Sequence, residues 1–190
     1  MPNRLFKSPG FTIPKVEILI KRVLLIALLG VMGFVYLGSS FIVLLVLFFI
    51  GSISMIYKRK IKGFPVGIEF VVMTTVIASK AYVPIVGLIF GAITSVTAQA
   101  VSGEYDAGMF LFFISTMLIG FISHYLPFSG LTILAIMVLF SDAFTQSVAF
   151  IGSTEQRMAA GAFVVTHLFI SIIFWNVFGE ILFNFAALAP

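Results

Sequence analysis

Residues 23–57 read VLLIALLGVMGFVYLGSSFIVLLVLFFIGSISMIY, a run without a single charged side chain. As one helix, this run would be about 50 Å long, whereas the hydrocarbon core of a bilayer is about 30 Å thick. Glycine and serine favour turns, so the step Gly38-Ser39-Ser40 is the natural break. The stretch therefore predicts a tight hairpin of two short membrane-spanning helices rather than one long helix.

The composition points to lipid as the solvent of this chain. Its 190 residues are 61% hydrophobic and 9% charged, and the mean hydropathy is +1.22. Soluble domains carry about 25% charged residues, so this chain cannot cover a globular surface with polar groups. We expect a single transmembrane domain over residues 1–190 and no soluble domain within this stretch. Within it, residues 1–22 form a basic N-terminal segment.

Further apolar stretches of spanning character lie at residues 65–79, 84–101, 108–125, 129–151 and 158–188. The last is too long for an upright span and must tilt, kink near Gly179 or end at the interface. The fold class expected is all-α, a polytopic transmembrane bundle of about seven helices.

The basic residues set the orientation. With the N-terminus inside, the cytoplasmic segments hold Arg4, Lys7, Lys15, Lys21, Arg22, Lys58, Arg59, Lys60, Lys62 and Arg157, and the outer segments hold Lys80 alone. This bias follows the positive-inside rule and also favours the hairpin, since one helix over 23–57 would separate the two basic clusters. The chain is thus expected in the cell membrane with a cytoplasmic N-terminus. Its basic residues would contact lipid headgroups rather than nucleic acid. Residues 11–22 fit an interfacial helix and a basic tail on the headgroups equally well.

Polar residues near the outer face form a candidate solute-binding group. Its members are Lys80, Tyr82, His124, Tyr125, Trp175, Asn176, Glu180 and Asn184. Such a mixture suits a small polar or aromatic solute, although aromatic, histidine and lysine side chains also populate the interfacial belt of membrane proteins. Asn176, Glu180 and Asn184 are four residues apart and are expected to form one stripe. Lys80 or His124 is the expected partner of Glu180.

Two acidic residues lie near the inner face and are candidates because buried charges in membranes are costly. Asp142 suits a cation or proton site, or else a pair with His167 or Ser171 on a neighbouring helix. Glu69 is close enough in sequence to the basic loop to pair with Lys60 or Lys62.

Small residues mark close helix packing, and known catalytic motifs are missing. Gly87 and Gly91 have the GxxxG spacing, which suits packing inside the bundle or against a partner's helix. The sequence lacks phosphate-binding loops, HExxH and GxSxG. It has two histidines and no cysteine, so it offers few ligands for a transition metal. We expect neither an enzyme nor a cofactor or metal site.

Three segments carry a resemblance to known families. Residues 64–70 read FPVGIEF, residues 83–95 read VPIVGLIFGAITS, and residues 102–108 read SGEYDAG. With the apolar helix up to residue 125, they resemble the substrate-binding S subunits of energy-coupling-factor vitamin transporters, and they are similar to MreD-type cell-shape membrane proteins. The transporter resemblance implies a solute pocket open to the outside and a cytoplasmic partner that supplies ATP-driven motion.

The leading hypothesis is therefore a small membrane subunit that binds a solute and works with a partner complex. One alternative is a non-catalytic subunit or scaffold that packs against other membrane proteins through its glycine-rich helices. Another is a membrane enzyme that acts on lipid, with Asp142 essential for turnover.

The orientation can be tested by cysteine labelling, because the chain has no native cysteine. In intact cells, Ser40→Cys should react with a membrane-impermeant maleimide, whereas Gly63→Cys should react only after permeabilisation. Protection of the first and labelling of the second would reverse the orientation.

Overall fold

The computed structural model describes residues 38–59, 66–103 and 107–188, and these are almost entirely helical. The helices are α2 (Ser39–Ile53), α3 (Val71–Ala81), α4 (Pro84–Ser102), α5 (Ala107–Ile122), α6 (Gly130–Thr145), α7 (Ser147–Ile151), α8 (Thr154–Phe174) and α9 (Glu180–Leu188). A 3₁₀ turn, η1 (Ile56–Arg59), follows α2, and a π-helical segment, η2 (Trp175–Gly179), joins α8 to α9. The described residues contain no strand, so the all-α prediction is confirmed.

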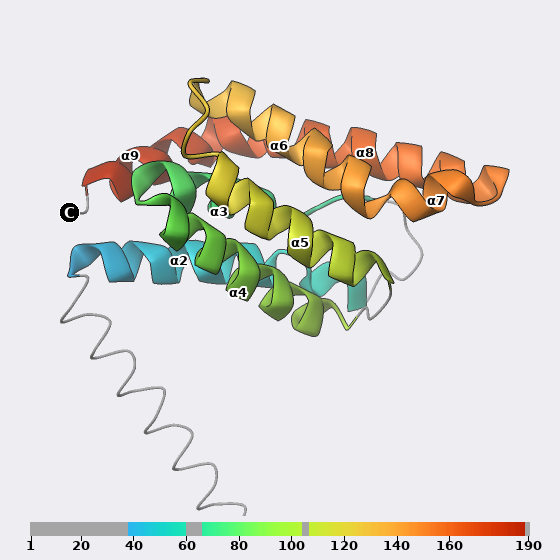
Figure 1. Ribbon diagram of the computed structural model, residues 1–190, viewed down its shortest axis with the longest axis horizontal. Helices are drawn as coiled ribbons and strands as arrows, with labels where there is room; N and C mark the ends of the chain where they lie inside the picture. Colours follow the sequence, from blue (N-terminus) through green and yellow to red (C-terminus); the bar gives the residue numbers. More distant parts are fainter. Residues whose placement is uncertain (1–37, 60–65, 104–106, 189–190) are drawn as a thin grey trace, which may run out of the picture.

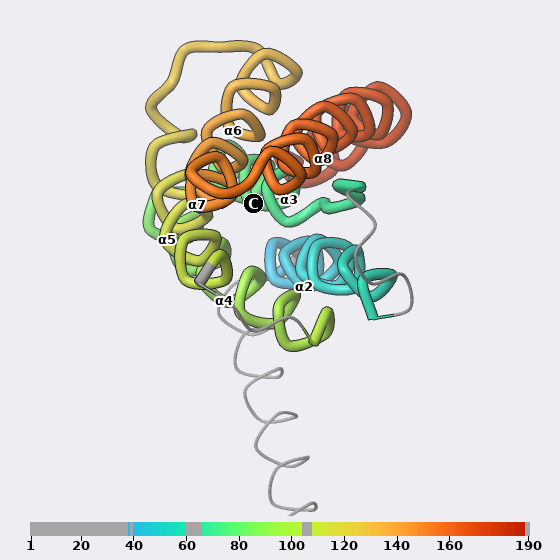
Figure 2. Tube along the Cα trace, turned by 90° about the vertical axis from the view of Figure 1, so that its right-hand side faces the viewer, coloured from blue at the N-terminus to red at the C-terminus, as the bar shows by residue number. Residues whose placement is uncertain are grey.

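The helices run roughly along one axis, with the short helix α3 near the middle (Figures 1 and 2). Helices α2, α4, α5, α6 and α9 all contact α3. Residues 71–79 of α3 are accordingly all buried, polar and apolar alike. A helix enclosed on every side has no solvent or lipid face, so it needs no amphipathic pattern.

Helices α4 and α5 approach each other closely through glycines. A Cβ atom added at Gly87 would lie 2.2 Å from the carbonyl oxygen of Gly120, and one added at Gly91 would lie 2.5 Å from that of Thr116. Both glycines are buried. The predicted packing role of Gly87 and Gly91 is therefore met within this chain, against α5 and α3.

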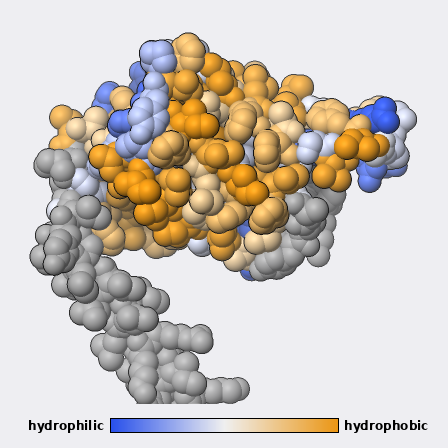
Figure 3. Space-filling view, in the orientation of Figure 1, coloured by the Kyte–Doolittle hydropathy of each residue, from blue (hydrophilic) through white to orange (hydrophobic). Residues whose placement is uncertain are grey.

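The surface of the bundle is largely apolar. Exposed large hydrophobic side chains occur on every long helix, among them Phe49, Ile89, Phe110, Leu139 and Phe169. On the face seen in Figure 3 they cover the middle of the body, and hydrophilic residues gather toward its ends. Monomeric soluble proteins rarely expose such continuous apolar surface.

Within the part of the chain that the structure describes, three stretches are long and apolar enough to cross a membrane, namely Ser40–Arg59, Pro84–Ser102 and Thr154–Leu188. The helices Val71–Ala81, Gly108–Ile122 and Gly130–Thr145 are apolar but shorter. These features are compatible with a membrane protein.

Several predicted boundaries need correction. The helix expected over 65–79 begins only at Val71, and residues 66–70 before it are not helical. The helix expected over 129–151 is broken at Gln146 into α6 and α7. The last helix starts earlier than expected, at Thr154, because Ser153 and Gln156 form a reciprocal capping box there.

Two glycines at which the sequence suggests an interruption lie at irregular backbone. Helix α2 begins directly after Gly38, whose φ of 56° suits glycine. The first half of the predicted hairpin lies outside the described residues. The deformation expected near Gly179 is the π-helical segment η2, which ends at that residue.

The α4–α5 contact gives a stability test. Gly87→Ala should lower the free energy of unfolding by about 1–3 kcal/mol, because its methyl group meets backbone rather than a movable side chain. Thermal unfolding in mild detergent would measure this.

The matched control is Gly161→Ala on α8, where an added Cβ meets nothing within 4 Å. Alanine favours helix over glycine, so this variant should melt at or slightly above the wild-type temperature. Equal melting of the two variants would refute the close packing of α4 on α5.

Candidate functional site

Residues 66–70 cross the interior of the bundle as non-helical backbone. Their main-chain groups therefore need partners other than a helix, and hydroxyl groups supply them. The amide of Gly67 donates to Thr166 Oγ1 at 3.0 Å, that of Ile68 to the Tyr57 hydroxyl at 3.1 Å, and that of Phe70 to Ser54 Oγ at 3.0 Å. The Tyr57 hydroxyl in turn donates to the carbonyl of Val66. Buried polar backbone is tolerated only with such partners.

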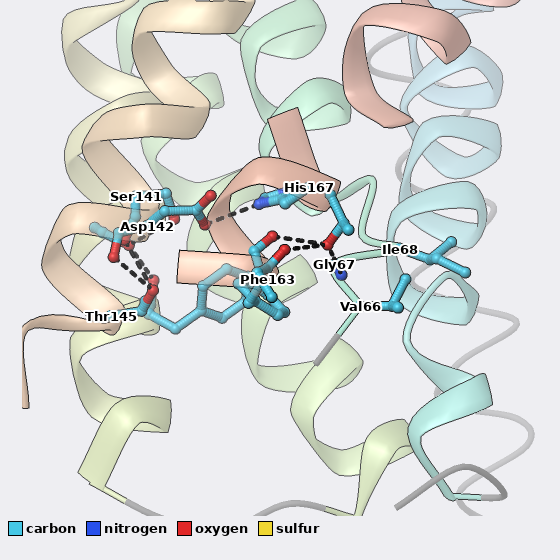
Figure 4. A network of polar contacts seen from close by, with 12 residues as sticks. Val66, Gly67, Ile68, Ser141, Asp142, Thr145, Phe163 and His167 are labelled. Atoms are coloured by element: carbon cyan, nitrogen blue, oxygen red, sulfur yellow. Dashed lines mark hydrogen bonds and ion pairs between the residues drawn. The ribbon is translucent and has the colours of Figure 1, made fainter. Parts of the chain in front are cut away.

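Glycine lets this unwound segment approach α8 closely. A Cβ atom on Gly67 would lie 2.3 Å from His167 Cβ and 2.9 Å from its Cα. Three residues further on, the ring of Phe70 stacks on that of Phe174, with 4.0 Å between the ring centroids. Figure 4 shows Gly67 and its neighbours lying against α8 beside His167.

Asp142 and His167 form a buried pair at this contact. Asp142 on α6 accepts a hydrogen bond at its Oδ1 from Nδ1 of His167, at 2.8 Å (Figure 4). The two side chains are 2% and 0% exposed. Of the two partners considered for Asp142, the structure selects His167. Ser171, one turn later on α8, has no hydrogen-bond partner for its Oγ among the described residues.

Glu69 joins this pair from the unwound segment. Its side chain is 4% exposed, and its carboxylate interacts electrostatically with His167, Lys58 and Asp142. The main chain of Glu69 also lies beside the imidazole. The partners expected for Glu69, Lys60 and Lys62, lie outside the described residues. Three ionisable side chains from three separate elements are thus brought together, which the sequence did not predict.

The candidate solute-binding residues divide into two sets at the other end of the bundle. In the first set, the ammonium of Lys80 donates to the carbonyl of Leu126, and Nδ1 of His124 donates to that of Ser79 at 2.9 Å. Tyr125 is exposed, with its ring edge-on to His124. These contacts fasten the loop after α5 to the end of α3.

Tyr82 belongs to the same set and lies in the short connection between α3 and α4. Burial raises the pKa of its phenol, and a hydrogen bond to Ser40 opposes this. The protonated hydroxyl donates to the Ser40 carbonyl at 3.5 Å. Tyr82 therefore links the start of α2 to the end of α3.

The second set surrounds a pocket. Trp175, Glu180 and Asn184 line an open cavity of about 290 Å³ together with Ser129, Gly130, Leu131 and Phe183. Trp175 is 2% exposed, and its indole packs on Gly130 and Gly179, at both of which a Cβ atom would collide with the ring. Glycine at these two positions allows the indole to lie flat beneath the pocket.

The π-helical segment decides which polar residues face this pocket. Glu180 and Asn184 line it, but Asn176 does not: its amide donates to the carbonyl of Ile172 on its own helix at 2.9 Å. The single stripe expected of Asn176, Glu180 and Asn184 is therefore interrupted, because the turn Trp175–Gly179 departs from α-helical spacing. Among the described residues, no ion pair joins Glu180 to Lys80 or His124; those two bind main-chain carbonyls instead.

Comparison with known proteins does not place the chain in a family. No family model matches it, and neither the curated proteins nor the solved structures contain a significant match.

The two polar regions differ in what they can do chemically. The pocket is open and combines a carboxylate, an amide, a hydroxyl and an indole, the kind of lining that orients a small solute. The cluster of Glu69, Asp142 and His167 is closed and can hold or exchange a proton. Within the described part of the chain, no three histidine, aspartate or glutamate side chains come together so as to hold a metal ion.

Proposed function

We propose that the chain is a multi-pass integral membrane protein that binds a small polar or aromatic solute in the pocket beside Trp175. We propose further that it does so as a subunit of a larger complex in the cell membrane. The apolar surface of the bundle and its three spanning-length stretches support the membrane setting. The start of α8, which carries Arg157, lies at one end of the bundle, and the connection from α3 to α4, next to Lys80, lies at the other (Figure 1). This arrangement supports a cytoplasmic N-terminus.

The pocket carries the proposal. Its volume of about 290 Å³ is at the small end of ligand sites, so it suits a metabolite rather than a lipid or a peptide. Glu180 is exposed and available to a cationic or hydrogen-bond-donating group, and Asn184 offers both a donor and an acceptor. The indole of Trp175, which is 2% exposed, borders the pocket from the protein interior and contributes apolar lining.

A partner complex is the part of the proposal that rests on resemblance. The S subunits that residues 64–125 resemble bind vitamins and depend on a partner for ATP-driven motion. The proposed pocket would face outward, and the opposite end, with η1 and the start of α8, would face such a partner.

The alternatives have less support in the structure. A scaffold that receives a partner's helix at Gly87 and Gly91 would need those glycines on the surface, but both are buried. A lipid-acting enzyme that depends on Asp142 would need that carboxylate within reach of lipid, whereas it is 2% exposed and paired with His167.

Solute binding can be followed through Trp175, the single tryptophan of the chain. The purified full-length protein should be screened with a panel of small cationic, polar and heteroaromatic metabolites by thermal stabilisation and indole fluorescence. A binder should raise the melting temperature and change Trp175 emission. Glu180→Ala and Asn184→Ala should weaken its binding about 10-fold or more each, as expected for the loss of a hydrogen bond to a charged or polar group.

Asn176→Ala is the matched control, since this amide lies outside the pocket and bonds to its own helix. It should leave binding unchanged. A panel without any binder, or a binder equally sensitive to all three substitutions, would refute the pocket as the solute site.

A further inference from the structure

The cluster of Glu69, Asp142 and His167 leaves several deeply buried polar atoms without partners. Within the described residues, Glu69 Oε1, Asp142 Oδ2, His167 Nε2 and Ser171 Oγ all lack a hydrogen bond. The side chains that carry them are at most 4% exposed. An unpaired polar group in an apolar interior is costly, so unpaired atoms that lie together call for an explanation. Three of these atoms belong to the ionisable side chains of the cluster, and the fourth belongs to Ser171, one helical turn after His167.

The charges around the imidazole favour an additional positive charge at this place. Two carboxylates act on His167, from Glu69 on the unwound segment and from Asp142 on α6. Lys58 of η1 interacts electrostatically with both carboxylates, and its ammonium lies 5.5 Å from the centroid of the Phe163 ring. Tyr57 of η1 faces the segment too, but its hydroxyl binds main-chain atoms of residues 66 and 68.

We propose that Glu69, Asp142 and His167 form a buried proton-binding site, in which Nε2 of His167 takes up the proton. In the neutral imidazole, Nδ1 carries the hydrogen that is donated to Asp142 Oδ1, so the lone pair of Nε2 is free. A proton from water forms an N–H bond with that lone pair. The imidazole becomes an imidazolium, and the net charge of the three side chains changes from −2 to −1.

Several features suit this site to a proton rather than a metal cation. Asp142 already holds one ring nitrogen in a fixed tautomer and orientation, which is how histidine proton sites are prepared. Gly67 presses the main chain against His167 and leaves little room beside it. The described acidic and histidine side chains do not converge in a metal-holding geometry.

The site is also placed to influence the rest of the molecule. His167 lies on α8, eight residues before Trp175, or about 12 Å along the helix. It contacts the segment that leads into the central helix α3. This proposal stands independently of solute binding at the pocket, and its test needs no solute.

Imidazole nitrogen NMR on the full-length protein in nanodiscs tests the proposal. The chain has two histidines, so His124→Gln leaves His167 as the single reporter. Between about pH 5 and about pH 10, His167 should change from a doubly protonated to a singly protonated ring. In Asp142→Asn and in Glu69→Gln, that transition should move to lower pH by about one unit or more, because each removes a negative charge that stabilises the imidazolium. Asp142→Asn keeps an oxygen that can accept from Nδ1, which preserves the fold.

The outcomes separate cleanly. One unchanging state of His167 over the whole pH range would overturn the proposal, as would a transition that is the same in wild type and in both carboxamide variants. Titrations in sodium and in choline buffers provide the control for a metal ion. A transition that shifts with the sodium concentration but not with the choline concentration would show that the site binds a metal cation. That result would overturn the proposed proton-binding role.

Discussion

The backbone of residues 66–70 has to be satisfied inside an apolar bundle, and much of the structure depends on how this is done. The segment makes no helix of its own, and Gly67 and Glu69 are buried, so its amides take hydroxyl partners from η1, the end of α2, and α8. Ser54, Tyr57 and Thr166 thereby fix the segment between those elements. Ser54 and Tyr57 precede the segment by 9 to 16 residues, whereas Thr166 lies 99 residues after Gly67, so the contact to α8 is the one that needs the rest of the bundle in place.

The unwound segment explains the unusual position of α3. A helix of 11 residues is about 16 Å long, too short for a bilayer core. The sequence leads one to expect a helix over 65–79, but residues 66–70 are not helical and α3 is correspondingly short. In membrane proteins, non-helical backbone inside the bundle is tolerated where it is buried in protein or lines a site. Here the non-helical segment places Glu69 beside His167 and Asp142.

Helix α8 and the π-helical segment connect the two polar regions. His167 meets the unwound segment in the middle of the bundle, and Trp175 forms the floor of the pocket near its end. Both contacts depend on glycines in the facing element, at residues 67 and 130. A change in the position of α8 would therefore reach both regions at once, although each can be studied alone.

The sequence predicted the helical class and, to within a few residues, the extent of α4 and α5, because these follow from hydrophobic length. It also marked Gly38 as the place where a new helix begins, and it offered a kink near Gly179 as one of three ways to fit the last helix into a membrane. It also named His167 as a partner of Asp142. It did not predict that residues 66–70 are unwound, since their composition suits an apolar helix and nothing in the sequence marks Ser54, Tyr57 and Thr166 as partners of their amides. For the same reason it placed Glu69 beside the basic loop rather than beside His167. Asn176 was grouped with Glu180 and Asn184 because helical spacing was assumed through a π turn that nothing local in the sequence marks.

Amide hydrogen exchange of the full-length protein in nanodiscs tests the central constraint most directly. The amides of Gly67, Ile68 and Phe70 should exchange as slowly as those of α3, and Tyr57→Phe should accelerate exchange at Ile68 selectively, because Ile68 loses its acceptor. Exchange of all three amides at the rate of an exposed, unstructured chain would contradict the account, since these residues would then not be held inside the bundle.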